Sequence, residues 1–278
     1  MFRDTCHLAH FAALCGAAFV ALTCSRPANA AAVPNFPNSD FDILSADTGE
    51  LIGLEHYTLD QTASSWTLHG ENRYLNGEYD IEDDKLAVGG DPALPRLLRF
   101  RHDFFNADGS PSVAAHLDTQ TGLGVCGKTE AGKLELKTGQ FKFPDDTYGG
   151  ASILIPIQNF VSHSDRDGIL KLHVFNCAPT PKLIAVDVKP RPRRQSWVDY
   201  PGELERVDLE ANFGFWTVVI EPFIPKLALW FDPSQDWLLV GAQSQRYYKG
   251  TKIILVRKRE ASIIRGALDQ PPSPPPSQ

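Results

Sequence analysis

The stretch Thr121–Gly127, TGLGVCG, has the Gly-x-Gly-x-x-Gly spacing of a dinucleotide-binding turn. Such a turn follows a buried strand and opens a helix, whose N-terminal amides bind the pyrophosphate. The residues that follow Gly127 read KTEAGKLELK, which alternates like a strand and contains a glycine. Because the helix is missing, we interpret these glycines as a turn that lets two strands approach closely. We therefore expect no cofactor here.

Cys126 in this stretch and Cys177 are the two cysteines that follow residue 30. In an exported protein, such a pair is most simply a disulfide. Closing a loop of about fifty residues would stabilise the fold by roughly 4 kcal/mol in the chain-entropy model. Two unpaired buried thiols are the alternative.

The other residue types that carry chemistry form no recognisable site. No histidine after residue 30 lies in a His-x-His, His-Glu-x-x-His or Cys/His pattern, so we expect no metal site. Ser152 leads into an apolar run rather than a nucleophile elbow. Glycoside hydrolysis needs two carboxylates across a cleft, but neighbours such as Asp83 and Asp84 are ordinary on a surface. An enzyme is the least favoured class, and we assign no catalytic residue.

The segment 213–240 concentrates large apolar side chains and is interrupted by Pro222 and Pro225, which favour an edge or a bend. These side chains either fill the core of a sandwich or barrel, or line a cavity for an acyl chain or an apolar peptide. The candidate ligand residues are Phe215, Trp216, Phe223, Trp230, Phe231 and Trp237.

A basic, proline-rich segment stands out near residues 189–196 of this acidic chain. We expect it to be a loop and the best boundary within the chain. It is either a solvated linker or a site for anionic headgroups, because guanidinium groups suit phosphate. The candidate headgroup residues are Arg191, Arg193 and Arg194.

The elements that must position these residues are mainly strands. Asn76-Gly77, Asp108-Gly109 and Ala131-Gly132 separate short runs with β-branched and aromatic residues and partial alternation, typical of antiparallel hairpins. The best helix signal is DDTYGGASILIPIQNF, residues 145–160, which Asp145 or Asp146 would cap. Residues 202–213 fit a helical turn or another strand. We predict a mainly β protein, with a strongly curved antiparallel sheet or incomplete barrel and one or two short helices.

The N-terminal thirty residues have the features of a secretory signal peptide. Arg3 precedes an apolar run from Leu8 to Leu22, and Ala28-Asn29-Ala30 gives the small-x-small pattern of a cleavage site. We expect cleavage after Ala30 and a periplasmic or secreted protein. An uncleaved anchor and lipidation at Cys24 are the alternatives.

The remaining chain is acidic. The whole sequence has 27 Lys and Arg against 34 Asp and Glu. Without residues 1–30 there are 25 against 33, a net charge of −8, which argues against a nucleic-acid partner. No later segment has twenty uninterrupted apolar residues, so we expect no membrane span. We predict an extended segment at 31–44, one β-rich domain at 45–262 and a disordered proline-rich tail at 263–278.

Several stretches together resemble uncharacterised bacterial periplasmic domain families. They are GELIGLEHYTL, the serial hairpins, FPDDTYGGASIL, and PKLALWFDPSQDWLLV followed by KIILVRK. The predicted fold of those families is similar to the incomplete β-barrel of the lipoprotein carriers LolA and LolB. Over residues 45–259, the resemblance implies a strongly curved antiparallel sheet around a short helix, with a hydrophobic cavity. It assigns no catalytic or ligand residue, and the cysteine pair and the arginine-rich segment depart from it.

These observations favour an exported protein that binds a hydrophobic envelope ligand, such as a lipid or an acylated molecule, without catalysis. One alternative is an envelope interaction or scaffold protein that acts through its sheet surface or its tail. The other is a hydrolase without a recognisable motif. A cavity lined by the aromatics favours the first class, and a flat exposed apolar patch the second. Convergent polar residues with perturbed acids in a cleft favour the third.

Overall fold

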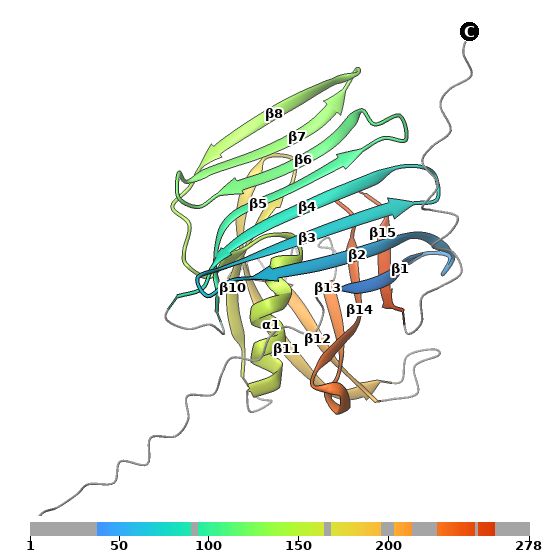
Figure 1. Cartoon of the computed structure of the whole chain (residues 1–278), viewed down its shortest axis with the longest axis vertical. Coiled ribbons are helices and arrows are strands. Elements are labelled where there is room, and N and C mark those ends of the chain that lie inside the picture. The colour runs from blue at the N-terminus through green and yellow to red at the C-terminus, as the bar shows by residue number, and fades with distance from the viewer. Residues whose placement is uncertain are drawn as a thin grey trace, which may run out of the picture. The chain divides into compact units, whose positions relative to one another are not determined.

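The computed structural model contains one sheet of fifteen strands, together with a short helix (Figure 1). The structure describes residues 38–89, 94–163, 168–195, 203–212, 227–247 and 250–258. The strands of its first half are β1 (Ser39–Ser45), β2 (Leu51–Gln61), β3 (Ser65–Tyr74), β4 (Tyr79–Ala87), β5 (Arg96–Phe105), β6 (Pro111–Asp118), β7 (Leu123–Glu130) and β8 (Lys133–Gln140). Those of the second half are β9 (Thr147–Tyr148), β10 (Leu170–Cys177), β11 (Pro181–Gln195), β12 (Leu204–Ala211), β13 (Leu227–Asp232), β14 (Leu238–Gln245) and β15 (Lys252–Arg257).

The first described strand lies in the middle of the sheet, and the strands after it continue to one edge. The second half of the chain begins at the opposite edge and continues back to the middle. Strands β1 to β8 follow one another outward, and β9 to β15 return to the middle, where β15 pairs with β1. The pairs are antiparallel except β9 with β10, which is parallel. The described edges, β8 and β9, do not pair with each other, so the sheet stays open. The predicted fold class, an open and curved antiparallel sheet, is confirmed.

The predicted hairpins account for much of this meander. Asn76-Gly77 joins β3 to β4, Asp108-Gly109 joins β5 to β6, and Ala131-Gly132 joins β7 to β8. The glycine of each pair has a positive φ, as tight hairpin turns require. The opening stretch TGLGVCG is also a turn, at Gly122, followed by β7 rather than by a helix.

One helical segment supplies the middle of the core. A 3-10 turn (Gly150–Ile153) runs directly into α1 (Leu154–His163), as the sequence predicts. Its buried side chains, including Ile155, Ile157 and Val161, join one cluster with residues of β1 to β7 and β10 to β14. The helix therefore connects the two halves of the sheet through apolar contacts.

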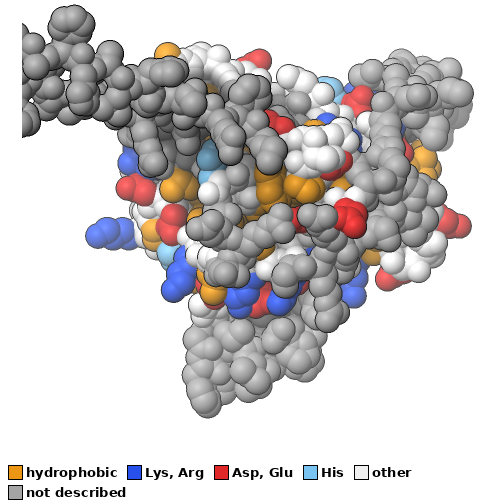
Figure 2. Space-filling view, turned by 90° about the horizontal axis from the view of Figure 1, so that it is seen from below, with side chains coloured by type: hydrophobic (Ala, Val, Ile, Leu, Met, Phe, Trp, Pro, Cys, Tyr) orange, Lys and Arg blue, Asp and Glu red, His pale blue; other side chains and the backbone are white. Residues whose placement is uncertain are grey.

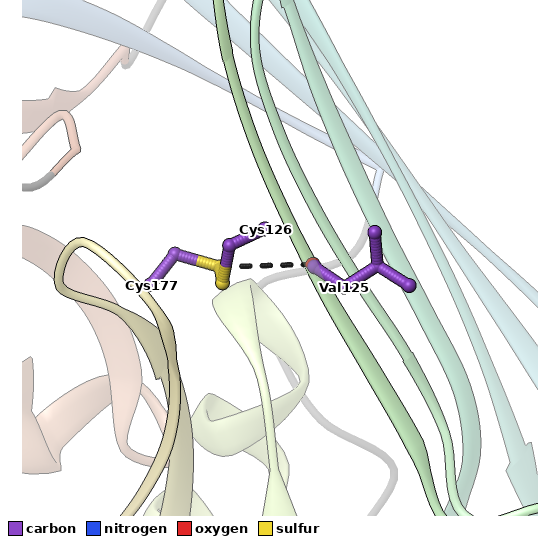
Figure 3. The surroundings of a disulfide bond; sticks show 3 residues. All are labelled: Val125, Cys126 and Cys177. Carbon is purple, nitrogen blue, oxygen red and sulfur yellow. Dashed lines mark hydrogen bonds between the residues drawn. A yellow bond between two sulfur atoms is a disulfide. The ribbon is translucent and has the colours of Figure 1, made fainter. Parts of the chain in front are cut away.

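The predicted disulfide is present between Cys126 and Cys177, whose Cα atoms are 5.5 Å apart (Figure 3). Cys126 lies in β7 and Cys177 ends β10, so the bond joins strands that are next to the two edges. The Cys177 sulfur is also 3.7 Å from the carbonyl oxygen of Val125. A β-carbon at Gly124 would lie 2.8 Å from the ring of Phe175 in β10, which explains why this approach requires glycine. The disulfide thus closes the seam of the open sheet.

Two predicted segments differ from the structure. The basic segment 189–196 is not a loop, because β11 continues to Gln195 and pairs with β12 across a bulge between Arg191 and Arg194. Asp145 and Asp146 do not cap the helix, because they pair with Arg96 and His173. The β-strand geometry explains the first difference, since prolines are tolerated at bulges.

Other expectations are placed as follows. Residues 39–44 of the extended segment form most of β1, and residues 204–211 form β12. The expected signal peptide at 1–30 and tail at 263–278 lie outside the described residues. Within the described part of the chain, no helix is long and apolar enough to span a membrane.

Candidate functional site

Strand β4 turns three acidic side chains toward the interior of the sheet. Its sequence YDIEDDKLA places Asp80, Glu82 and Asp84 on one face, because alternate residues of a strand share a face. All three are buried, with 1%, 4% and 1% of their surface exposed. Asp83 on the opposite face is half exposed and pairs with His69. The interior of the fold therefore contains a row of carboxyl groups.

Two of these carboxyl groups cap the helical segment. The backbone amide of Ala151 donates to Glu82 Oε1 at 2.5 Å, and that of Ser152 donates to Asp84 Oδ2 at 3.2 Å. Acceptors at this position satisfy helix amides that have no partner within the helix. Gly150 has a φ of +48°, and a β-carbon there would collide with the Glu82 carboxyl group. A glycine is needed because the helix starts directly on β4.

Asp80 is the centre of a polar cluster. Asn72 Nδ2 donates to Asp80 Oδ1 at 2.7 Å, and His102 Nε2 lies 2.7 Å from the same oxygen. The other ring nitrogen of His102 is 3.2 Å from Glu82 Oε2. Arg246 forms an ion pair with Glu78, and its Nε lies 3.6 Å from Asp80 Oδ2. The basic side chains of His102 and Arg246 thus both contact acidic groups.

Glu55 of β2 occupies a different environment. It is 3% exposed, and its Oε1 accepts a hydrogen bond from the hydroxyl of Tyr57 at 2.6 Å. Its Oε2 is buried without a hydrogen-bond partner. Phe41 of β1 and Asn72 of β3 lie opposite Glu55 in the register of the sheet.

Glu55, Asp80, Glu82, His102 and Arg246 line a partly open cavity of about 230 Å³. Other described residues complete this polar wall with aromatic and amide groups: Tyr57, Asn72, Tyr74 and Phe104. The guanidinium of Arg246 stacks on the ring of Tyr74 at 3.7 Å, which fixes its position.

The remaining wall of the cavity is mostly apolar. It comes from β12 to β15, with Leu209, Leu227, Leu229, Leu239 and Ile253 as its main side chains. The face of the molecule in Figure 2 shows hydrophobic side chains gathered near its middle, with charged side chains around them. The cavity is therefore amphipathic, since β2 and β4 provide its carboxyl groups and β12 to β15 provide most of its leucines. Gln243, Ser244 and Gln245 of β14 add polar groups on the second side.

Burial changes the ionisation of this wall. Removal from water raises the pKa of Glu55 to about 8 and that of Asp84 to about 8. Burial and the neighbouring Asp84 also raise the pKa of Glu82 well above its usual value. Burial disfavours the charged form of His102, but Asp80 and Glu82 outweigh this effect and raise its pKa. At neutral pH, Glu55 is therefore mainly protonated.

Unpaired polar atoms are concentrated in the same wall. Five buried side-chain atoms there make no hydrogen bond: Glu55 Oε2, Asn72 Oδ1, Tyr74 Oη, Asp80 Oδ2 and Arg246 Nε, of which the last two form an ion pair with each other. Buried polar groups are normally hydrogen-bonded, because an unmade bond costs about 1 to 3 kcal/mol. Glu55, Asn72 and Tyr74 therefore retain hydrogen-bonding capacity in residues that line one cavity.

The three aromatic ligand candidates that the structure describes lie outside this cavity. Phe231 is 1% exposed in the core, and Trp237 packs partly buried against the same core. Trp230 faces Arg206, whose guanidinium carbon lies 5.5 Å from the ring. None of these three lines the cavity described above. Phe215, Trp216 and Phe223 lie outside the described residues.

The arginine-rich segment does not contribute to the cavity either. Arg191 donates through Nε to Asp208 at 2.7 Å and also pairs with Glu210, so its charge is met by acids of β12. The side chains of Arg193 and Arg194 are outside the described part of the structure. Ser152 is fully buried and donates to the carbonyl oxygen of Gly149, as expected of a packing residue.

The described residues contain no group of three or more His, Cys, Asp or Glu that could hold a metal ion. The polar wall itself was missed from the sequence. Its signal is the spacing of Asp80, Glu82 and Asp84 at every second position, with Leu86 continuing the same face. The same alternation of acidic residues also fits a strand face exposed to solvent, so the pattern alone does not distinguish a buried face from an exposed one.

The comparisons with known proteins do not assign the chain to a family. No protein-family model matches the chain, and no curated protein matches it. Among solved structures, the chain is similar to the crystal structure of a beta-barrel-like protein of the domain of unknown function DUF1849 from Brucella abortus. The identity is 10%, the match covers 79% of this chain and 94% of that chain, and the TM-score is 0.45.

Proposed function

We propose that this protein binds a small amphipathic molecule in its interior cavity. The observation that carries the proposal is a cavity lined on one side by buried carboxyl, amide and hydroxyl groups with incomplete hydrogen bonding and on the other side mostly by leucines. Ligand sites combine apolar lining with a few polar groups that orient the ligand. The apolar part would contact β12 to β15, and the polar group would contact β2 to β5 and Arg246.

The size of the cavity limits the ligand. At about 230 Å³ it is smaller than the roughly 300 to 1,000 Å³ of sites for drug-sized molecules. It suits a small molecule or one end of a larger one, such as the head region of a lipid. The sequence resemblance to carrier-like envelope domains points in the same direction.

Export is part of the same proposal. The N-terminal thirty residues have the pattern of a signal peptide, and disulfides such as Cys126–Cys177 persist in oxidising compartments. Cell fractionation and N-terminal sequencing test this part, and we expect a periplasmic or secreted protein that begins at Ala31. A chain that retains its first thirty residues in the cytoplasm would contradict it.

Native mass spectrometry of the protein purified without detergent tests the binding. We expect extra mass that is lost on denaturation. Leu229→Phe, which fills the cavity, should abolish it, and Ala242→Leu should do the same from β14. Leu136→Phe is the matched control, because Leu136 is 58% exposed on the edge strand β8. Equal occupancy in the cavity variants and the control would refute binding at this site.

One observation favours a second candidate, an enzyme that uses acid–base chemistry. A carboxyl group with a pKa of about 8, such as Glu55, exchanges a proton readily near neutrality. If the protein is an enzyme, the molecule that it releases differs chemically from the molecule that it bound. Incubation of a co-purified ligand with fresh protein would show turnover in the wild type and none in Glu55→Gln, whereas an unchanged ligand would eliminate this candidate.

A further inference from the structure

The cavity wall contains more carboxyl groups than cations available to pair with them. Among the described residues that line it, the basic side chains are His102 and Arg246. Both are engaged: His102 contacts Asp80 and Glu82, and Arg246 contacts Glu78 and Asp80. Glu55 instead contacts uncharged groups, the hydroxyl of Tyr57 and the amide of Asn72.

The groups that surround Glu55 do not supply a cation of their own. Tyr57 lies on the same strand, Phe41 is opposite on β1, and Asn72 is opposite on β3. Asp80 of β4 acts on Glu55 as a second negative charge. Glu82, Tyr74, His102 and Arg246 complete the titratable and charged groups of the wall.

The unpaired atoms of the wall favour a ligand that donates hydrogen bonds. Two of the five are acceptors without an ion-pair partner when Glu55 is ionised: Glu55 Oε2 and Asn72 Oδ1. An ammonium group has three N–H donors and no acceptor. Aromatic rings of Tyr57, Tyr74 and Phe104 also line the cavity, and ring faces attract cations.

We propose that the polar group of the ligand is a protonated amine that pairs with the carboxylate of Glu55. This inference rests on the proposed binding function and specifies its ligand class. A carboxylate ligand would instead meet Glu55, Asp80 and Glu82, and an uncharged alcohol would leave the negative charge of an ionised Glu55 unpaired. The apolar part of the amine lies against the leucines of β12 to β14.

Binding of the amine is coupled to the ionisation of Glu55. In the free protein this group has a pKa of about 8, because burial disfavours its charge. Below that pH, an incoming ammonium must displace the proton, so its affinity rises about tenfold per pH unit and levels off above pH 8. One proton is released for each amine bound at pH 7.

Three probes of similar size separate the possibilities by isothermal titration calorimetry. At about 30 Å³ for each heavy atom, as in liquid water, the cavity holds roughly eight heavy atoms. We therefore choose n-heptylamine, 1-heptanol and heptanoate. The wild-type protein should bind the amine at least tenfold more tightly than the other two, with proton release measured from buffers of different ionisation enthalpy.

Two variants assign the effect to Glu55. Glu55→Gln should weaken amine binding at least tenfold and remove its pH dependence, whereas Glu135→Gln on the exposed strand β8 should change neither. If heptanol or heptanoate binds as tightly as heptylamine, the amine inference is wrong and the proposed binding function stands. If the wild type binds none of the three probes, both are wrong. The comparison of probes requires only the wild type, so it holds even where Glu55→Gln fails to fold.

Discussion

Removing the Cys126–Cys177 disulfide should destabilise the protein by about 4 kcal/mol. The bond closes a loop with a sequence separation of 51. In the chain-entropy model, the unfolded chain loses about 14 cal/mol/K for a loop of this length, or about 4 kcal/mol at 25 °C. The bond also joins β7 to β10 at the seam of the open sheet, where no ladder pairs the described edge strands. Apart from the disulfide, side-chain packing such as that of Phe175 on β10 against Phe100 on β5 joins the two sides.

Urea unfolding of oxidised and reduced wild-type protein measures this loss, with the double variant Cys126→Ala/Cys177→Ala as an independent test. If the unfolding free energy falls by about 2 to 3 kcal/mol for each molar of urea, the unfolding midpoint should fall by about 1.3 to 2 M in both cases. Reductant should not affect the double variant, which controls for other effects of the reagent. Hydrogen exchange should accelerate in β7 and β8 more than in β2 and β3, which lie far from the seam in the strand order.

A loss below about 1 kcal/mol in both the reduced wild type and the double variant would refute the reasoning. It would mean that apolar contacts hold the seam, such as Phe175 against Gly124. A loss in the double variant alone would point to the missing side-chain atoms of the buried Cys126 rather than to the cross-link.

Three further predictions concern the polar wall, and unfolding free energies measure all of them. The folded protein holds a proton on Glu55 that the unfolded chain loses near pH 4.5, so the stabilisation from this group falls as pH rises toward 8. In that range the unfolding free energy of Glu55→Gln should increase relative to that of the wild type by about 1.4 kcal/mol per pH unit, and a constant difference would contradict this. Gly150→Ala should cost at least about 2 kcal/mol, because the alanine has a positive φ and its β-carbon clashes with Glu82. Gly132→Ala is also at positive φ but lies in open space, so it should cost only about 1 to 2 kcal/mol, and equal losses would refute the effect of the clash. Arg246→Gln should cost about 3 to 5 kcal/mol, because it removes the guanidinium that pairs with the buried Asp80 and with Glu78, whereas exposed Arg101→Gln should cost under about 1 kcal/mol. Similar losses in the two variants would refute this.

The parts of the fold that depend on local chemistry were predictable. Asn-Gly, Asp-Gly and Ala-Gly pairs specify tight turns because their glycines adopt a positive φ, and all three lie between the strands expected. The helix at residues 150–163 and the disulfide also follow from short-range or compositional signals.

The candidate site was not predictable, because its orientation depends on how the whole sheet curves. In β2, Glu55 and Tyr57 face inward while Leu54 lies on the other face, so simple hydrophobic alternation would choose the wrong side. The capping of the helix by Glu82 and Asp84 joins residues almost seventy positions apart, and no local signal indicates such a contact. The composition of the aromatic-rich segment suggested a ligand site, yet its residue Phe231 fills the core.

The two halves of the sheet contribute different groups to the cavity, and this difference supports the proposed function. The polar wall comes from β2 to β5 and Arg246, and the apolar wall comes mainly from β12 to β15. Helix α1 packs in the core shared by both halves, and the disulfide holds them together at the seam. These supports compensate for a wall of buried carboxyl groups that would weaken the fold by itself. A ligand with one charged end and one apolar end would complete contacts on both halves at once, so the same unpaired groups that weaken the free protein would give the bound state its specificity.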